Sequence, residues 1–196
     1  TMPSNTLYVT KRGSFSFVLG LVASALFRRF EALRLDKKTP PSALFIPNRK
    51  SGDGKPTKVR RLRASDASKG FYELLSQLTE VGKGDFGRRF REITNGCERV
   101  YVIESEDGSR IVASGTLVLE RKFTRNCGTC GHIEDVVVDE GERGRDLGRV
   151  IVEALTRAAE ACGCYKVILD CNESNVGFYE RCGFKRKEVQ MAKYFI

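Results

Sequence analysis

Hydrophobic positions between residues 58 and 196 follow two alternating periods. Runs rich in β-branched residues predict strands at residues 58–62, 99–105, 110–123, 132–139, 165–171 (a buried strand) and 188–195. Apolar residues at helical spacing predict helices at residues 65–81, 85–93, 147–162 and 173–183. The "EDGS" stretch at 106–109 predicts a hairpin turn, and Gly163 ends the third helix.

The order of these elements, β-α-α-β-β-β-α-β-α-β, predicts an α/β (α+β) protein. Its mixed sheet begins with antiparallel hairpins and ends with a β-α-β crossover around the helix at 147–162. We find no internal repeat.

Residues 1–55 have a different character. A short apolar stretch lies between basic pairs in "KRGSFSFVLGLVASALFRRF", and Glu31 is the first acidic residue. Two interpretations fit: a signal or organelle transit segment, and a disordered tail or accessory helix. Residues 49–58, rich in Gly, Pro, Ser and Lys, predict a linker. We therefore divide the chain into a basic leader with its linker, residues 1–57, and a folded domain, residues 58–196.

The positive net charge of +9 resides in the leader. Residues 1–65 hold 14 Lys and Arg against 3 Asp and Glu, whereas residues 66–196 hold 20 against 22. The nearly neutral body argues against a groove for nucleic acid. No run reaches the length of about 18 apolar residues that a membrane span needs, so membrane contact is expected only through the leader. We expect a location in the cytosol or at the cytoplasmic face of a membrane, with association with an organelle or the endoplasmic reticulum through residues 1–55 as the alternative.

Seven cysteines at irregular spacing predict reduced thiols rather than a disulfide framework. Cys127-x-x-Cys130 and Cys162-x-Cys164 together could form a zinc site. Structural zinc favours two well-spaced ligand pairs, and only one residue separates the members of the second pair. We expect no metal.

The turn "RGRDLG", residues 143–148, leads directly into the helix at 147–162. The first N–H groups of a helix have no partner within the helix and lie at the positive end of its dipole, which suits an anion. Gly144 and Gly148 would allow close approach, and the arginines would add charge. A plain capping loop with solvated arginines fits the same residues.

The residues downstream separate these interpretations. Together, "RGRDLG", "YKVILDC" and "NVGFYERCGF" resemble the GNAT superfamily of acetyl-CoA-dependent N-acetyltransferases, whose R/Q-x-x-G-x-G/A turn binds pyrophosphate. Asp146 stands where that family has its first glycine, so we expect its side chain to point away and its backbone to bind. The resemblance implies a GNAT fold: a mixed central sheet, flanked by helices and splayed at the acetyl-CoA site.

Within the superfamily, "CGHIEDVVVD", "LTEVG", "ERKF" and "MAKYF" resemble the eukaryotic group that acetylates glucosamine 6-phosphate for UDP-N-acetylglucosamine synthesis. This resemblance spans Val59 to Phe195. It implies a homodimer with sites near the subunit interface, and it makes residues 58–196 an acetyltransferase domain.

The same resemblance implies site residues. Tyr179 would protonate the departing thiolate, and Glu134 or Asp170 would hold the attacking amine. The residues implied for acetyl-CoA are Val136, Val137, Val138, Arg143, Gly144, Arg145, Asp146, Leu147, Gly148, Arg149, Asn175, Phe178, Tyr179 and Arg181. Those implied for the amino sugar and its phosphate are Thr79, Lys122, Phe123, Thr124, Arg125, Glu134, Asp135, Tyr165, Lys166, Asp170, Lys193 and Tyr194.

Direct transfer from thioester to amine agrees with the residue types present. His132 is the single histidine, so a Ser/His/Asp or Cys/His nucleophile is open only through it, and we favour attack without an acyl-enzyme. Neighbouring strand residues face opposite sides, so of Glu134 and Asp135 we favour Glu134 for the substrate side. The alternatives are an acetyltransferase for a protein N-terminus or a polyamine, and a non-catalytic acyl-CoA-binding or metal-binding module.

Overall fold

The computed structural model of the chain describes residues 43–50, 56–82 and 84–195. These residues belong to one unit of the chain, Pro40–Ile196. Residues 1–42, which contain the apolar stretch behind both interpretations of the leader, and residues 51–55 of the predicted linker lie outside the described residues. In the part that is described, no helix has the length and apolar character required to cross a membrane.

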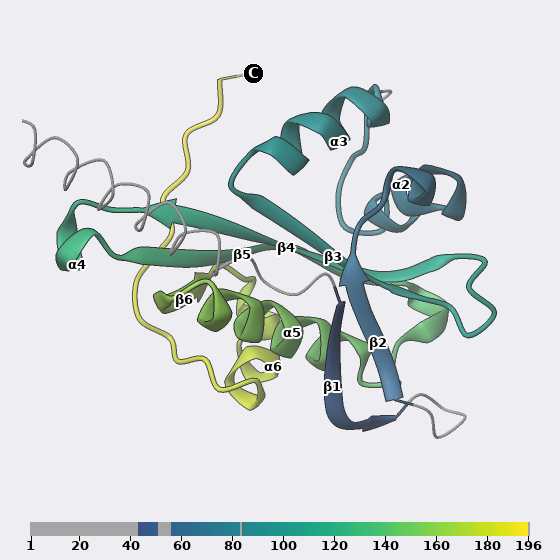
Figure 1. Cartoon of the computed structure of the whole chain (residues 1–196). Coiled ribbons are helices and arrows are strands. Elements are labelled where there is room, and N and C mark those ends of the chain that lie inside the picture. Colours follow the sequence, from purple (N-terminus) through teal and green to yellow (C-terminus); the bar gives the residue numbers. More distant parts are fainter. Residues whose placement is uncertain (1–42, 51–55, 83, 196) are drawn as a thin grey trace, which may run out of the picture. The chain divides into compact units, whose positions relative to one another are not determined.

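The described residues contain one six-stranded sheet in which strands adjacent in sequence are also neighbours in space (Figure 1). The strands are β1 (Ala43–Lys50), β2 (Pro56–Arg61), β3 (Glu98–Glu104), β4 (Ile111–Arg121), β5 (Thr129–Val138) and β6 (Cys164–Leu169). Strands β1 to β5 pair antiparallel, and β5 and β6 pair parallel. This arrangement confirms the predicted mixed sheet, with hairpins first and a β-α-β crossover last.

Helices cover both faces of the sheet (Figure 1). Helix α5 (Leu147–Ala161) lies on one face, where Ile151, Ala154 and Leu155 are 0% exposed against β3, β4 and β5. The opposite face carries α2 (Phe71–Leu75) and α3 (Phe86–Asn95), where Phe71 and Leu74 pack with residues of β3 and β4. Two short helices complete the chain: α4 (Thr124–Cys127) and α6 (Val176–Arg181).

The helix predicted for residues 65–81 is broken. A 3-10 turn (Ala64–Lys69) precedes Gly70, whose left-handed backbone (φ 72°) separates it from the short α2. Asp66 is fully buried, and its two carboxylate oxygens each accept a hydrogen bond of 2.8 Å from the Arg60 guanidinium, while Oδ2 also accepts from the Arg63 N–H at 2.7 Å. This charge pair ties the turn to β2, and α2 ends at Leu75 with no regular helix in residues 76–81.

The folded domain also begins earlier than Lys58. That position lies inside β2, and β1, within the predicted leader, pairs with β2 through Leu44↔Val59 and Phe45↔Lys58. The predicted domain boundary at residue 58 rested on amino-acid composition and is wrong, because a Pro- and Lys-rich stretch can still form an edge strand.

Two expectations for the C-terminal third are wrong. The strand at 165–171 was expected to be buried, but β6 lies at the edge of the sheet and Tyr165 is 44% exposed. The strand expected at 188–195 is absent: the chain from Phe184 to Phe195 has no helix or strand, and Met191 and Phe195 are 88% and 89% exposed. Among the described residues, no strand pairs with this segment.

Candidate active site

The parallel strands β5 and β6 separate at their carboxyl ends. Their pairing ends at Ile133↔Leu169, where β6 stops, while β5 continues through Glu134 to Val138. The far part of β5 therefore has an edge that no strand covers among the described residues. The sheet opens here as the expected splayed fold requires, and ligands in α/β sheets characteristically bind at such openings.

A β-bulge at Asp135 shapes this opening. Thr116 pairs with Glu134 and Ser114 with Val137, so β5 carries one extra residue opposite Gly115, and Asp135 has a left-handed backbone (φ 52°). Gly115 allows the close packing, because a Cβ there would lie 2.7 Å from the Leu155 side chain. Because of the bulge, the side chains of β5 do not alternate between the two faces of the sheet here, and Glu134 and Asp135 are both exposed.

The three valines after the bulge are held by their side chains. Val136 and Val138 pack toward α5, and Val137 is buried on the α2 side. Only their backbone groups are left to face the opening.

The turn before α5 combines two left-handed residues with an uncapped helix end. Gly144 (φ 84°) has open space where a Cβ would be, and Asp146 (φ 61°) precedes the helix without any side-chain cap. Aspartate is one of the residues that tolerate this conformation, which explains how it replaces the family's glycine. The Asp146 carbonyl accepts from the Val150 N–H at 3.1 Å, so helix α5 begins at this residue.

Gly148 has a packing role in addition to any role in binding. A Cβ on Gly148 would lie 3.3 Å from the Phe178 ring and 3.6 Å from Val138. The start of α5, the end of β5 and helix α6 therefore meet at this glycine.

The arginines of the turn differ in their partners. Arg145 forms ion pairs with Glu142 and Glu106, so its charge is already shared between two carboxylates. Arg143 is exposed and Arg149 is half-buried. The structure therefore presents Arg143 and Arg149, rather than Arg145, as charges for a phosphate.

Glu134 at the opening lies near enough to Asp170, which follows β6, and to Tyr179 on α6 to be electrostatically coupled to both. Partial burial, together with the carboxylates of Asp170 and Asp135, raises the pKa of Glu134. Burial, and then neighbouring Cys171, Cys182 and Glu134, raise the pKa of Tyr179. A phenol in this setting keeps its proton at neutral pH, and the carboxyl group holds a proton more readily than an ordinary glutamate.

Helix α6 fixes Tyr179 by ring packing. The Tyr179 ring meets Phe178 edge to face at 4.9 Å and Phe184 at 6.2 Å between ring centroids. The Phe184 N–H also donates to the Tyr179 carbonyl at 3.1 Å. Asn175 precedes the helix and Arg181 ends it, both exposed.

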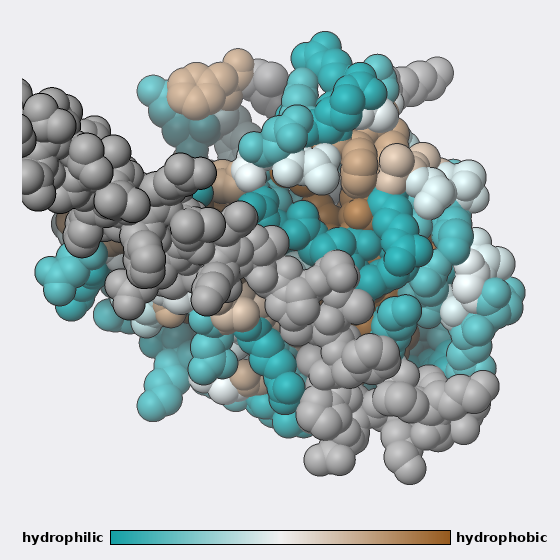
Figure 2. All heavy atoms as spheres, viewed as in Figure 1, coloured by the Kyte–Doolittle hydropathy of each residue, from teal (hydrophilic) through white to brown (hydrophobic). Residues whose placement is uncertain are grey.

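An open hollow of ≈ 550 Å³ adjoins the bulge. It contains two residues predicted for the substrate, Thr79 and Asp135, and is otherwise lined mainly by Tyr72, Leu75 and Leu78. Hydrophobic atoms reach the surface between α3 and α2 in Figure 2, on a face that is otherwise largely hydrophilic. The hollow gives Asp135 a partly apolar surrounding on the α2 side.

The other predicted substrate residues lie at the opposite end of β5. Lys122, Phe123, Thr124 and Arg125 belong to the β4–β5 hairpin, and Tyr165 and Lys166 begin β6. In the sheet, Cys130 pairs with Lys166 whereas Ile133 pairs with Leu169, next to Asp170. The four residues of extended chain from Lys166 to Asp170 therefore separate these substrate residues from the opening by about 13 Å. Lys193 and Tyr194 are exposed in the C-terminal segment.

Two residues near the opening were not predicted. Gln77 bonds to Asp139 and Glu140 at the end of β5, and the Gln190 side-chain amide donates to Asp170 at 2.9 Å. Asp139 caps the turn after β5 by accepting a hydrogen bond from the Gly141 N–H. An aspartate directly before a turn is a sequence signal for this role. Gln77 and Gln190 have no such signal, because their partners are distant along the chain.

A sheet that opens beside an uncapped helix end, with a tyrosine and two carboxylates at the opening, is the site of a group-transfer enzyme that binds an anionic ligand. The model of the Acetyltransferase (GNAT) family matches residues 66–184, which include the opening, the turn before α5 and helix α6. The chain belongs to this family.

Individual relatives indicate a narrower group within this family. The chain is 52% identical over 143 residues to the glucosamine 6-phosphate N-acetyltransferase of Arabidopsis thaliana, covering 70% of this chain and 96% of that protein. It is 48% identical over 139 residues to glucosamine 6-phosphate N-acetyltransferase 1 of Dictyostelium discoideum, covering 69% and 88%. The crystal structure of the Arabidopsis thaliana glucosamine-6-phosphate N-acetyltransferase matches with a TM-score of 0.68 and 50% identity, covering 70% of this chain and 97% of that one.

Proposed function

We propose that this chain transfers the acetyl group of acetyl-CoA to the amine of glucosamine 6-phosphate, forming N-acetylglucosamine 6-phosphate for UDP-N-acetylglucosamine synthesis. Family membership supports acetyl transfer, and the names of the relatives support the acceptor. The single observation that carries the proposal is the separation of β5 and β6 beside the start of α5, where Glu134 is electrostatically coupled to Asp170 and to Tyr179.

The opening fits acetyl-CoA on two grounds. The N-terminus of α5 has no side-chain cap, so its N–H groups and dipole suit a pyrophosphate, and Gly144 leaves space beside them. The uncovered edge of β5 at Val136 and Val138 suits the amide groups of a pantetheine arm. Arg143 and Arg149 supply charge for the phosphates.

Acetyl-CoA supplies the activated acyl group. The sugar amine must be uncharged to attack, and Glu134, with its raised pKa, is placed to orient this amine and take its proton. A carbon–nitrogen bond forms, the carbon–sulfur bond breaks, and the Tyr179 hydroxyl donates its proton to the departing thiolate. Tyr179 then regains a proton from solvent. Asp170, held by Gln190, helps to fix the amine.

The decisive experiment measures free-thiol release from acetyl-CoA with glucosamine 6-phosphate, glucosamine, an unblocked peptide and spermidine. We expect kcat/KM to be highest for glucosamine 6-phosphate, with glucosamine lower by at least about tenfold, equivalent to about 1.4 kcal/mol. Spermidine belongs in the panel because the carboxylates of Glu134, Asp135 and Asp170 would also suit a polycation. Faster turnover of spermidine or the peptide would overturn the assignment of the acceptor.

We further propose that the protein acts as a homodimer, in which the β4–β5 hairpin and the C-terminal segment serve the partner's site. Phe123 is 99% exposed, and Val189, Met191 and Phe195 are each at least 85% exposed. Such a concentration of exposed apolar side chains is typical of a surface that binds another chain. The basic residues of the hairpin, Lys122 and Arg125, would then approach the sugar phosphate of the second subunit.

Analytical ultracentrifugation tests this arrangement. The wild type is expected at twice the mass of the chain, and Phe123→Glu is expected to shift it toward the monomer and raise KM for glucosamine 6-phosphate. Ala161→Glu, at an exposed and uncharged position of α5, is the matched charge control. A monomeric and fully active wild type contradicts the proposal.

A further inference from the structure

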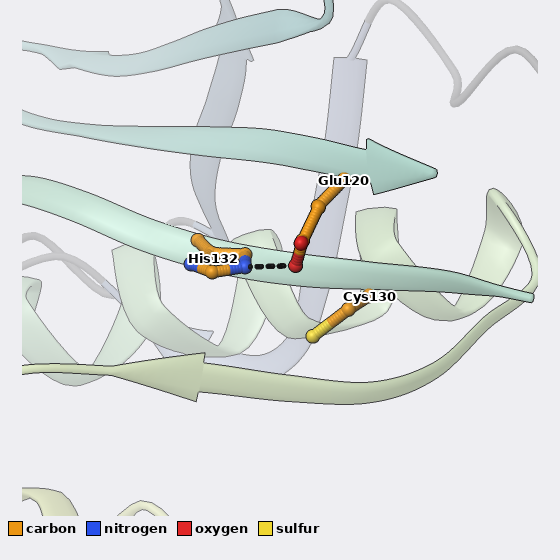
Figure 3. Close-up of side chains that lie close together, drawn as sticks. All are labelled: Glu120, Cys130 and His132. Atoms are coloured by element: carbon orange, nitrogen blue, oxygen red, sulfur yellow. Dashed lines mark hydrogen bonds and ion pairs between the residues drawn. The ribbon is translucent and has the colours of Figure 1, made fainter. Parts of the chain in front are cut away.

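Glu120, Cys130 and His132 form a mixed cluster outside the opening described above (Figure 3). One ligand atom from each residue lies within 4.8 Å of the other two. It is the only group of three such donors among the described residues, and Cys127, Cys162 and Cys164 are not part of it. The four-cysteine set considered from the sequence therefore does not assemble.

The strand register explains the cluster. Glu120 on β4 pairs with Cys130 on β5, and His132 follows two residues later, so all three side chains share one face of the sheet. Figure 3 shows the Glu120 carboxylate pointing toward His132 and the Cys130 sulfur pointing into the same space. The three donors come from a rigid part of the sheet rather than from a loop.

We infer that these three side chains form a binding site for a transition-metal ion of the zinc type. Thiolate, imidazole and carboxylate are the donors that Zn²⁺ and Co²⁺ accept in four-coordinate sites, and three protein ligands leave one position for water.

The present hydrogen bonds show how the ion would enter. Glu120 uses Oε1 for the Lys122 amine at 2.6 Å and Oε2 for His132 Nε2 at 2.8 Å. An ion can therefore replace the contact between Oε2 and Nε2 while Lys122 keeps Oε1. The Glu120 and His132 side chains are 42% and 30% exposed, which gives access from solvent, whereas Cys130 is fully buried behind them.

Binding changes the protonation of two ligands. The Cys130 S–H bond breaks as the sulfur–metal bond forms, and its proton goes to solvent. His132 must offer the Nε2 lone pair, so its remaining ring proton resides on Nδ1. With Glu120 and Cys130 both anionic, the charge of a divalent ion is neutralised within the site.

Titration of the untagged, metal-free full chain with Co²⁺ tests this site. We expect one ion per chain, a thiolate-to-cobalt charge-transfer band, and loss of the band on addition of Zn²⁺. Cys130→Ser should abolish the band. Cys127→Ser, which alters an exposed thiol three residues away, should retain it. Loss of the band in Cys127→Ser, or its absence in the wild type, overturns the assignment.

A second variant, Glu120→Gln, tests the metal site without the risk of misfolding that Cys130→Ser carries. Cys130 is fully buried and its variant can fail to fold, whereas the Glu120 side chain is 42% exposed. Glu120→Gln should weaken Co²⁺ binding by roughly tenfold or more. Unchanged affinity contradicts the site. Because binding is measured without acetyl transfer, its outcome is separate from that of the proposed function.

Discussion

The side-chain amide of Gln77 donates to the carboxylate of Asp139 at 3.1 Å across 62 positions of the sequence. The same side chain accepts from the Glu140 N–H at 2.9 Å. Gln77 follows α2 beside the hollow that contains Thr79, and Asp139 begins the turn that leads to α5. One glutamine therefore joins the proposed amino-sugar side of the site to the proposed cofactor side.

Gln77→Ala should raise KM for acetyl-CoA. Loss of two hydrogen bonds frees the turn before α5, and at about 0.5–1.5 kcal/mol for each bond the increase is expected to be up to about 5- to 150-fold. Steady-state kinetics with each substrate varied in turn measure the effect. Ser76→Ala is the control, because its hydroxyl bonds only within α2. Equal KM values in the two variants would refute the role.

Tyr179→Phe should lower kcat by about 10²- to 10⁴-fold, the usual contribution of a positioned acid. Ring packing against Phe178 and Phe184 is retained, so binding of coenzyme A by calorimetry should change little. The raised pKa of Tyr179 places its loss of the proton above the usual tyrosine range. The loss of activity that is due to ionisation of Tyr179 should therefore appear only at strongly alkaline pH, and turnover unchanged in the variant would exclude the proton donation.

Asp170→Asn should lower the pKa of Glu134. Burial and the charges of Asp170 and Asp135 raise that pKa, so removal of one charge lets the carboxyl group ionise at lower pH. NMR titration of the labelled Glu134 side chain reports the change directly. Asp170→Glu keeps the charge and serves as the control. An unaltered titration midpoint in Asp170→Asn would show that the two carboxyl groups do not interact.

Glu104→Gln should destabilise the fold in a pH-dependent way. Hydrogen bonds from Arg60 and Lys69 lower the Glu104 pKa to about 2. Because the folded-state pKa is depressed, the stabilisation is fully present above the unfolded value near 4.5 and is lost as pH falls through about 2.

At pH 7 we expect a loss of about 1–3 kcal/mol in the free energy of unfolding, and the difference from wild type should shrink between about pH 4.5 and 2. Urea unfolding at several pH values measures it, with the exposed Glu160→Gln as control. A pH-independent difference would mean that the carboxylate charge is not responsible.

The strands and the long helices were predicted well from the sequence, because their hydrophobic periodicity reflects which side chains are buried. The helix at 147–162 is observed as α5, and the hairpin turn at 106–109 contains Gly108 with a φ of 71°. The register of a bulge has no such signal, so the positions of Glu134 and Asp135 could not be derived from alternation.

The predictions that failed share a physical cause. Asp66, in the 3-10 turn, forms a buried ion pair with Arg60 of β2, and this tertiary contact overrides the local helical pattern. The C-terminal residues have strand-like composition, yet a strand needs a neighbour, and none pairs with them among the described residues. Proximity of Glu134, Asp170 and Tyr179 was implied only by family resemblance, because three separate elements contribute them.

The edge position of β6 has a consequence for solubility. An edge strand presents a row of backbone groups to which any extended chain can add, and Tyr165 and Ile168 make this edge partly apolar. Lys166 lies between them, and its charge discourages indiscriminate addition of a second strand. A truncated or partly assembled form that leaves this edge bare is expected to aggregate, with Lys166 as its principal safeguard.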